Sequence, residues 1–206
     1  MSGTLSKSRP PDSKIVVLGN PGVGKSALVV RFLTNRFIWE YDPTLERSYK
    51  HHTILDDEHT LIEILDTAGQ EDTMQQEGNA RWADGFVLVY AINDRQSFEA
   101  AGNLKHHLDM LKKTNVLCML VGNKVDLLHE RRVTTEEGEA LAVELSCGFF
   151  ETSASDGGED IPEVFYELHR DIKRRKSIET KGRRRSSAQQ VKHVFNRMLN
   201  KIGNSS

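Results

Sequence analysis

The chain has 206 residues, of which 37% are hydrophobic and 28% charged, and these values are ordinary for a soluble globular domain with an extension. No stretch comes near the roughly 20 apolar residues that a membrane-spanning helix needs, which argues against an integral membrane protein. The formal net charge of −2 conceals a segregation: residues 1–169 hold 16 Lys/Arg and 28 Asp/Glu, whereas residues 170–206 hold 12 and 2. Such asymmetry indicates a boundary and a tail with its own electrostatic role.

The first 13 residues are expected to be a disordered leader, because they contain Pro10-Pro11 and several serines. They hold no apolar core like that of a signal peptide, so we expect a cytoplasmic protein. The first glycine is Gly3 and does not directly follow Met1, so the myristoylation pattern is not met.

Short apolar runs alternate with longer segments of helical period along residues 14–176, which we expect to form one domain. Strands are expected at Ile15–Leu18, Tyr49–Leu55, Leu61–Leu65, Phe86–Tyr90, Val116–Val121 and Phe149–Phe150, and helices at Lys25–Thr34, Phe98–Lys112, Glu136–Leu145 and Ile161–Arg175. The second and third strands are joined by an acidic turn over residues 56–58 and should form an antiparallel hairpin. The alternation predicts an α/β fold with a mainly parallel, six-stranded sheet and helices on both faces. Ligands of such sheets bind beyond the carboxyl ends of the strands.

A phosphate-binding loop follows the first strand. Residues 19–26 read G-x-x-x-x-G-K-S between a strand and a helix, which is the context that this motif requires. Glycines let backbone N–H groups curl around an anion, and the helix N-terminus adds partial positive charge. Lys25 should reach the β- and γ-phosphates, and the Ser26 hydroxyl should ligate Mg²⁺. The loop predicts a nucleoside triphosphate site and leaves the base open.

The base is indicated by Asn123-Lys124-Val125-Asp126 at the end of an apolar strand. Here the sequence resembles the Ras superfamily, the small GTPases of the P-loop NTPase class, whose N-K-x-D motif recognises guanine. The resemblance implies that Asp126 accepts the ring N–H and amino protons of guanine. It also implies that Asn123 braces the loops and that the Lys124 stem covers the base. Glu151–Ser155 resembles the second base-contacting loop, in which the Ala154 N–H faces the guanine oxygen.

Two further segments resemble the switches of the same family. In residues 37–44, Phe37 would pack against the base and Thr44 would ligate Mg²⁺ and sense the γ-phosphate. In residues 66–71, Asp66 would hold Mg²⁺ through water, the Gly69 N–H would touch the γ-phosphate, and Gln70 would orient the attacking water.

The resemblance covers about residues 14–176 and implies a complete site. The implied catalytic residues are Gln70 and Lys25, and the implied ligands of Mg²⁺ are Ser26, Thr44 and, through water, Asp66. The implied nucleotide-binding residues are Gly19, Asn20, Pro21, Gly22, Val23, Gly24, Lys25, Ser26, Ala27, Phe37, Asp42, Thr44, Asp66, Thr67, Ala68, Gly69, Gln70, Asn123, Lys124, Asp126, Ser153 and Ala154.

Closer features narrow the resemblance to a growth-restraining member of the family. They are residues 31–40, residues 69–73 and the tail segment 182–187, and they imply a negative regulator of cell growth. One residue departs from the Ras pattern, because Pro21 stands where Ras has a glycine against the γ-phosphate. Proline has no N–H and a fixed φ, so its ring could obstruct the arginine finger of an activating protein.

Several other signals are given structural interpretations. His51-His52 and His106-His107 are not expected to bind metal, because neighbouring side chains diverge on strands and helices. Trp82 and Phe86 are expected to be packing residues. Cys118 and Cys147 lie in apolar runs and are expected to be reduced core residues.

The tail, residues 177–206, has no cysteine and therefore no prenylation signal of the kind typical of Ras relatives. Apolar residues from Val191 to Ile202 recur at helical spacing among basic ones, so an amphipathic helix is an option. A disordered or docked segment, weak reversible membrane contact, a partner groove and a nuclear-import patch remain alternatives. Arg183-Arg-Arg-Ser186 also offers a site for a basophilic kinase.

The leading interpretation is a monomeric GTP hydrolase that slowly converts GTP to GDP and phosphate and acts as a signalling switch. Its partners would be effectors, exchange factors and GTPase-activating proteins, bound through residues 37–49 and 66–82. The alternative is a nucleotide-dependent binding module with negligible turnover. A nucleic-acid-binding role is not expected, because the tail has one aromatic residue, Phe195, and no stacking platform.

Overall fold

A computed structural model describes residues 10–36, 47–67, 73–158 and 160–203 of the chain, with the side chains of residues 47, 73, 74, 76 and 182–203 left out of the description. The strands are β1 (Ser13–Leu18), β2 (Arg47–Leu55), β3 (Glu58–Asp66), β4 (Gly85–Ala91), β5 (Cys118–Asn123) and β6 (Gly148–Thr152). The helices are α1 (Lys25–Thr34), α2 (Thr73–Trp82), α3 (Arg95–Lys112), the 3₁₀ helix η1 (Val125–Glu130), α4 (Thr135–Leu145) and α5 (Asp160–Gly203).

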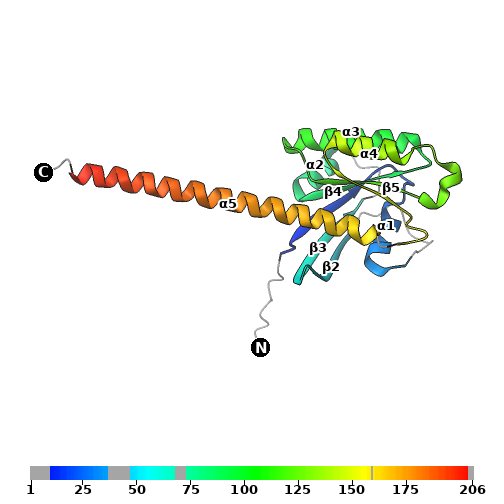
Figure 1. The fold of residues 1–206 in the computed structure, drawn as a ribbon, viewed down its shortest axis with the longest axis horizontal. Coiled ribbons are helices and arrows are strands. Elements are labelled where there is room, and N and C mark those ends of the chain that lie inside the picture. Colours follow the sequence, from blue (N-terminus) through cyan, green and yellow to red (C-terminus); the bar gives the residue numbers. More distant parts are fainter. Residues whose placement is uncertain (1–9, 37–46, 68–72, 159, 204–206) are drawn as a thin grey trace, which may run out of the picture.

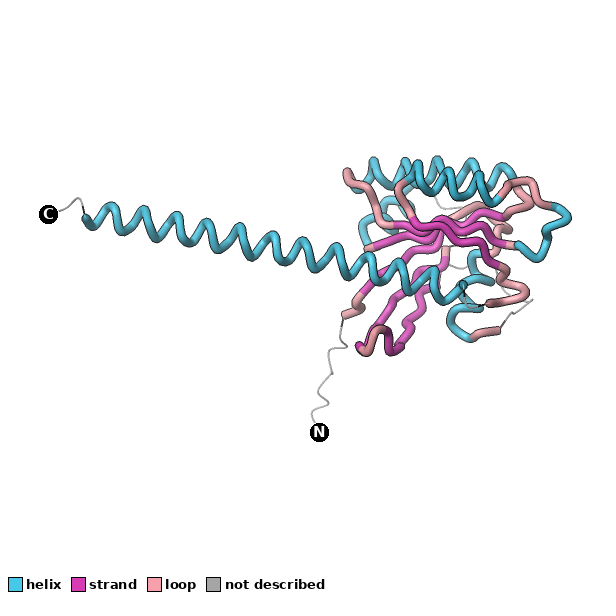
Figure 2. The backbone as a smooth tube through the Cα atoms, in the orientation of Figure 1, coloured by secondary structure: helices cyan, strands magenta, loops and turns pink. Residues whose placement is uncertain are grey.

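The strands form one six-stranded sheet in the order β2-β3-β1-β4-β5-β6. All neighbouring strands run parallel except β2 and β3, which are antiparallel. Helices α2, α3 and α4 cover one face and α1 and α5 the other (Figures 1 and 2). The predicted α/β fold, with its mainly parallel sheet, its single hairpin and helices on both faces, is confirmed.

The central strands are buried on both faces because apolar side chains fill successive positions. In β1, Ile15 and Val17 pack into the core under α1 and α5, whereas Val16 and Leu18 pack into the core under α2, α3 and α4. Strand β4 alternates in the same way. Successive side chains of a strand point to opposite faces, so a continuous apolar run serves two cores at once. This burial fixes the sheet whose carboxyl edge carries the loops described below.

The β2–β3 hairpin closes through a turn of two residues. Asp56 and Asp57 both have positive φ, 52° and 62°, as a type I′ turn requires. Glu58 already belongs to β3, so the turn is one residue shorter than the sequence suggested.

Helix α5 is much longer than predicted. It runs without a break from Asp160 to Gly203, across the expected domain boundary near Lys176, and its second half extends away from the sheet (Figure 1). Before that boundary its basic side chains pair with acidic residues of the domain: Arg170 with Asp56 at 3.0 Å and Lys173 with Glu58 at 2.6 Å. Part of the positive charge assigned to the tail therefore binds the domain itself.

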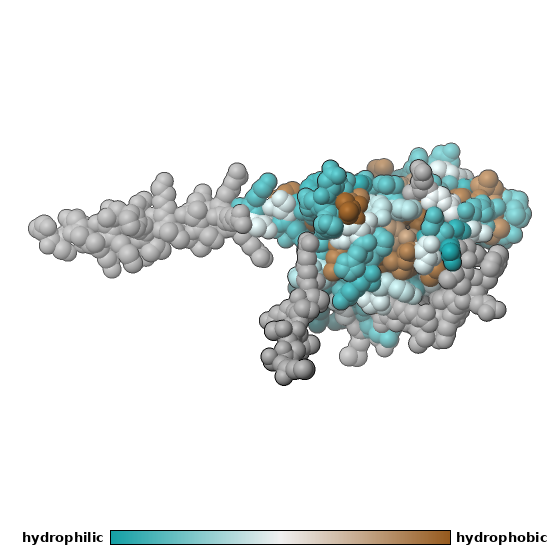
Figure 3. Space-filling model, turned by 90° about the horizontal axis from the view of Figure 1, so that it is seen from below, coloured by the Kyte–Doolittle hydropathy of each residue, from teal (hydrophilic) through white to brown (hydrophobic). Residues whose placement is uncertain are grey.

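The described surface mixes hydrophilic side chains with separated hydrophobic ones, as Figure 3 shows for one face. Within the described residues, no helix has the length and apolar character needed to cross a bilayer.

Candidate functional site

Most of the predicted site residues within the described ranges lie at or just beyond the carboxyl ends of four strands. Strand β1 leads into the glycine-rich loop 19–24, β3 ends at Asp66, β5 ends at Asn123 and β6 ends at Thr152. Because these four strands run parallel, their ends lie along one edge of the sheet. The topology thus brings together motifs that lie as far apart in the chain as Gly19 and Ala154.

The loop after β1 depends on glycine at two close backbone contacts. A Cβ at Gly19 would lie 2.2 Å from the Val89 carbonyl oxygen, and one at Gly24 would lie 2.3 Å from Asn123 Nδ2. Gly24 also has a φ of +98°, which L-residues with side chains rarely adopt. Between them, Pro21 and Gly22 are exposed and Val23 is buried. The loop therefore presents backbone, with its apolar anchor turned inward.

Helix α1 begins directly after this loop, and its N-cap residue offers no side chain to accept from the first N–H groups. The N-cap is Gly24, and no acidic residue stands in the first turn. Uncapped N–H groups and the helix dipole make such an N-terminus favourable for an anion. Lys25 is 6% exposed and folds back across the loop, where its Nζ donates to the carbonyl oxygens of Gly19 at 2.9 Å and Asn20 at 3.1 Å. These features concentrate positive charge at the loop.

Asn123 connects the two other loops to the phosphate loop. Its Nδ2 donates to the Val23 carbonyl oxygen at 2.8 Å, and its Oδ1 accepts from the Ala154 N–H at 3.1 Å and from the Thr152 hydroxyl at 3.4 Å. The side chain is 1% exposed, so these hydrogen bonds are shielded from water. The bracing inferred from the sequence is thus present in the structure.

In the loop after β6, the Ala154 N–H donates to Asn123 Oδ1 at 3.1 Å, and its contact with a guanine oxygen stays a prediction. Ser153 is hydrogen-bonded to Asp126: its hydroxyl donates to Asp126 Oδ1 at 2.6 Å and accepts from the Asp156 N–H at 2.9 Å. Asp126 is exposed, and Lys124, two residues before it, is half-buried with a φ of +70°. Ser153 thus fixes the orientation of a carboxylate that faces outward.

Two oxygen groups suited to Mg²⁺ lie at the start of α1 and at the end of β3. The Ser26 side chain is buried at the start of α1, and Asp66 is buried at the end of β3, opposite Val17 of β1. Thr67 follows Asp66 and donates from its hydroxyl to the Val17 carbonyl oxygen at 2.9 Å, which holds the end of β3 against β1. A hydroxyl and a carboxylate are the hard oxygen ligands that Mg²⁺ takes, so these residues fit the ion.

Sequence reasoning missed the part that two arginines play at this edge. Arg31 of α1 donates through Nε to the Ala154 carbonyl oxygen at 3.0 Å and through Nη2 to that of Ser155. Arg131 makes a bidentate ion pair with Glu151 at 2.6 and 2.9 Å. This pairing raises the pKa of Arg131. Arg31 thus holds the loop after β6 against α1, and Arg131 holds β6 itself through Glu151. Arg31 begins one of the segments that carry the resemblance, but nothing in the sequence indicates this contact, and no motif marks Arg131.

The remaining predicted residues belong to segments outside the described residues. They are Phe37, Asp42 and Thr44 of the first segment and Ala68, Gly69 and Gln70 of the second. Ala27 lies half-buried on α1.

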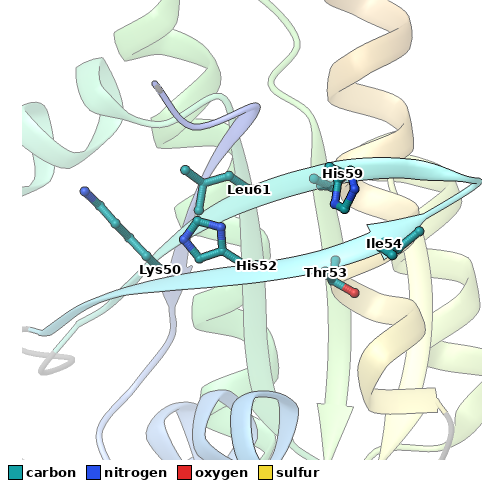
Figure 4. Close-up of a pocket in the computed structure, with 7 residues that line it drawn as sticks. Lys50, His52, Thr53, Ile54, His59 and Leu61 are labelled. Atoms are coloured by element: carbon teal, nitrogen blue, oxygen red, sulfur yellow. The ribbon is translucent and has the colours of Figure 1, made fainter. Parts of the chain in front are cut away.

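A cavity of about 330 Å³ lies elsewhere, on the β2–β3 hairpin (Figure 4). Its described lining includes Lys50, His52, Ile54 and His59, none of which was predicted to bind nucleotide. It lies along the part of β3 that precedes Asp66, away from the glycine-rich loop.

Comparison with known proteins supports the resemblance that the motifs carry. The family model described as "Ras family" matches residues 14–174. The chain is similar to the Ras-related and estrogen-regulated growth inhibitors of Bos taurus and Homo sapiens, each 58% identical over 196 residues, which cover 95% of this chain and 98% of each relative. It is also similar to the Ras-like protein rasS of Dictyostelium discoideum, 46% identical over 163 residues, which cover 78% of this chain and 84% of that protein.

Proposed function

Because the chain belongs to the Ras family of small GTPases, we propose that it binds GDP and GTP together with Mg²⁺ and slowly hydrolyses GTP, as a switch. The observation that carries this proposal is the convergence at one sheet edge of the uncapped α1 N-terminus, Lys25 and the Asn123 brace. Phosphate would bind at the α1 N-terminus and Lys25, and the base would bind beside Asn123.

The phosphates would displace the hydrogen bonds that Lys25 now makes within the loop. Its ammonium group is anchored by two carbonyl oxygens, so it is held close to the N–H groups of α1. An ammonium group and a helix N-terminus that face the same anion reinforce one another in a site of low solvent exposure.

Guanine would be recognised by Asp126. A carboxylate accepts two hydrogen bonds, which matches the ring N–H and amino group of guanine and mismatches adenine. The hydrogen bond from Ser153 leaves Asp126 in a fixed orientation, which reduces the entropy lost on binding. The half-buried Lys124 stem lies beside it and would cover the base.

Ser26, Asp66 and Thr44 would hold the ion, with Asp66 acting through water. Bound Mg²⁺ supplies neutralisation of charge on the β- and γ-phosphate oxygens. Gln70 would orient the attacking water, and Lys25 would stabilise charge that develops on the phosphates. We expect turnover without an activating protein of about 10⁻⁴ to 10⁻³ s⁻¹, the order found for unassisted Ras.

We propose further that the protein is a cytoplasmic monomer that restrains growth, as the name growth inhibitor suggests for two of its relatives. Effectors, exchange factors and activating proteins would bind residues 37–49 and 66–82. Membrane contact through the basic tail would be weak, reversible and sensitive to salt, because surface charge attraction fades within a Debye length.

Single-turnover hydrolysis by the full chain tests the proposal, with Gln70→Leu as the matched variant. The wild-type protein should release phosphate at the slow rate above, and the variant should bind GTP while hydrolysing it at least several-fold more slowly. If both proteins bind GTP but release phosphate at the same rate or not at all, the chain is a nucleotide-dependent binding module. The exposed Pro21 is the residue that favours that alternative.

A further inference from the structure

The only two cysteines of the chain lie side by side although 28 residues separate them in sequence. Cys118 begins β5, and Cys147 directly precedes β6, whose first residue Gly148 is in register with Met119. Cys118 and Cys147 each stand one residue before this pair, so they lie opposite each other where β5 and β6 begin. Neighbouring strands are about 4.8 Å apart, which is within the Cα separation that a disulfide can span.

Both side chains point to the same face of the sheet. Cys118 is buried in the core beneath α2, α3 and α4, and Cys147 packs against that core from a half-buried position. The register thus places the two thiols in neighbouring positions on that face, where each affects the ionisation of the other. Cys147 is thus the more exposed residue of the pair, and Cys118 is the buried one.

A buried lysine stands beside this pair. Lys105 of α3 is 1% exposed, and its Nζ is held by Asp109 Oδ2 at 2.6 Å and Asn115 Oδ1 at 2.7 Å. The hydrogen bond from Cys118 lowers the pKa of Cys147, and the Lys105 charge lowers it further, whereas burial opposes both. The hydrogen bond with Cys147 and burial raise the pKa of Cys118. Cys147 is therefore the thiol that becomes a nucleophilic thiolate, and Cys118 is the one that stays protonated.

We propose that Cys147 is a site of oxidation by hydroperoxides and that the product is a reversible intramolecular disulfide with Cys118. The Cys147 thiolate attacks the terminal peroxide oxygen, the O–O bond breaks, and the departing alkoxide or hydroxide takes up a proton. This step leaves a sulfenic acid on Cys147. The Cys118 thiol then loses its proton, its sulfur attacks the Cys147 sulfur, the S–O bond breaks and water leaves. The two thiols lose two electrons in total, and the hydroperoxide gains them.

The test is mass spectrometry of the reduced, full-length protein after treatment with hydrogen peroxide. The intact chain should lose the mass of two hydrogens without forming dimers, and peptide mapping without reductant should recover Cys118 linked to Cys147. A small dithiol should restore the original mass. If both thiols still react with a maleimide in denaturant after peroxide treatment, or if disulfides form only between chains, the proposal is wrong.

Two pairs of variants test separately the roles of the two cysteines and of the Lys105 charge. Cys118→Ser should leave a sulfenic acid on Cys147 that dimedone captures, whereas Cys147→Ser should give no such adduct at the same peroxide dose. Lys105→Met should slow the oxidation about two- to tenfold because less thiolate is present, whereas Lys105→Arg should retain most of the rate. Equal capture of both single-cysteine variants would contradict the assignment of Cys147 as the nucleophile.

Discussion

Three helices that start on the carboxyl side of the sheet differ in how they satisfy their first N–H groups. At α3, the Asp94 carboxylate accepts from the N–H groups of Gln96 and Ser97. At α4, Thr134 and Glu137 form a complete capping box. At α1, the N-cap is Gly24, which has no side chain with which to cap the helix. The chain thus caps α3 and α4 internally and leaves α1 open.

The difference shows where a fold gives up local stability in favour of a ligand. A side-chain cap contributes about 1 kcal/mol, so its omission at α1 is a local cost. The same omission leaves N–H groups and the positive helix end available to a phosphate. We therefore expect substitutions around α1 to change nucleotide affinity more than stability, and substitutions at the capped helices to do the reverse.

The largest effect on affinity is expected from Lys25→Met, which keeps the side-chain stem and removes the charge. Affinity for GDP and GTP should fall about tenfold to a hundredfold, because a hydrogen bond to a charged group contributes about 1.5–3 kcal/mol. Titration with a fluorescent guanine nucleotide measures this loss. Lys112→Met is the matched control, since Lys112 Nζ donates to the Ala83 carbonyl oxygen just before β4 begins, at the edge of the sheet opposite the site. Equal losses in both variants would remove the special role of Lys25.

Asn123→Ala should affect both properties at once. The Val23 carbonyl oxygen and the Ala154 N–H would each lose a buried partner. We expect the free energy of unfolding to fall by about 2–4 kcal/mol and nucleotide affinity to fall as well. Denaturant titration and nucleotide binding measure the two effects. Asn93→Ala, which removes an exposed hydrogen bond to Glu130, should change neither by much. Full affinity in the Asn123 variant would show that the brace is dispensable.

Thr134→Ala removes the cap of α4 and, in contrast to Lys25→Met, should lower stability while leaving nucleotide affinity nearly unchanged. The free energy of unfolding should fall by about 1 kcal/mol, which lowers Tm by about 2–4 °C in a domain of this size. Affinity for GDP should stay within about twofold of the wild-type value. Calorimetry and nucleotide titration of the same preparation give both numbers, and a large loss of affinity would break the proposed separation.

The smallest effect is on the pH dependence of stability, and it comes from His169, which contacts the start of β1 at Ser13. His169 is buried, its Nδ1 lies 2.9 Å from Ser13 Oγ, and burial lowers its pKa below 6.5 although Asp12 opposes the shift. The unfolded chain therefore binds this proton more readily, so the stabilisation is complete above pH 6.5 and is lost as the pH falls below it. His169→Asn should be less stable at pH 7.5 yet lose less stability between pH 6.5 and 5. The two slopes should differ by at most about 1.4 kcal/mol per pH unit, and identical slopes would contradict the assignment.

The sequence predicted those parts of the fold that are encoded by local pattern. All six strands were located: β1, β4 and β5 from continuous apolar runs, and β2 from its place in a hairpin that an acidic turn closes. Helix α1 was located to the residue because the loop motif fixes its start. Helix α2 was missed, because its sequence TMQQEGNARW is polar and shows no clear apolar stripe. The length of α5 was underestimated because the segregation of charge predicted a domain boundary near Lys176. No proline follows Pro162, so nothing in the sequence stops the helix there.

The site was predictable where motif residues act through the backbone or through a family pattern, as at Gly24 and Asn123. It was not predictable where two residues from distant segments act together. The hydrogen bond from Ser153 to Asp126 and the contacts of Arg31 with residues 154 and 155 depend on how the loops meet in space. Their spacing in sequence carries no periodic or motif signal.

The most direct test of the account is competition between GDP and ADP for the purified full chain with Mg²⁺, measured by displacement of a fluorescent guanine nucleotide. We predict that GDP displaces the probe at a concentration at least about a hundredfold lower than ADP, because adenine cannot donate to Asp126 as guanine does. Asp126→Asn should abolish this preference and favour xanthine nucleotides, whose ring oxygen accepts a hydrogen bond from the new amide. Equal displacement by GDP and ADP, or no binding of the probe at all, would contradict the assignment of this sheet edge as a guanine-nucleotide site.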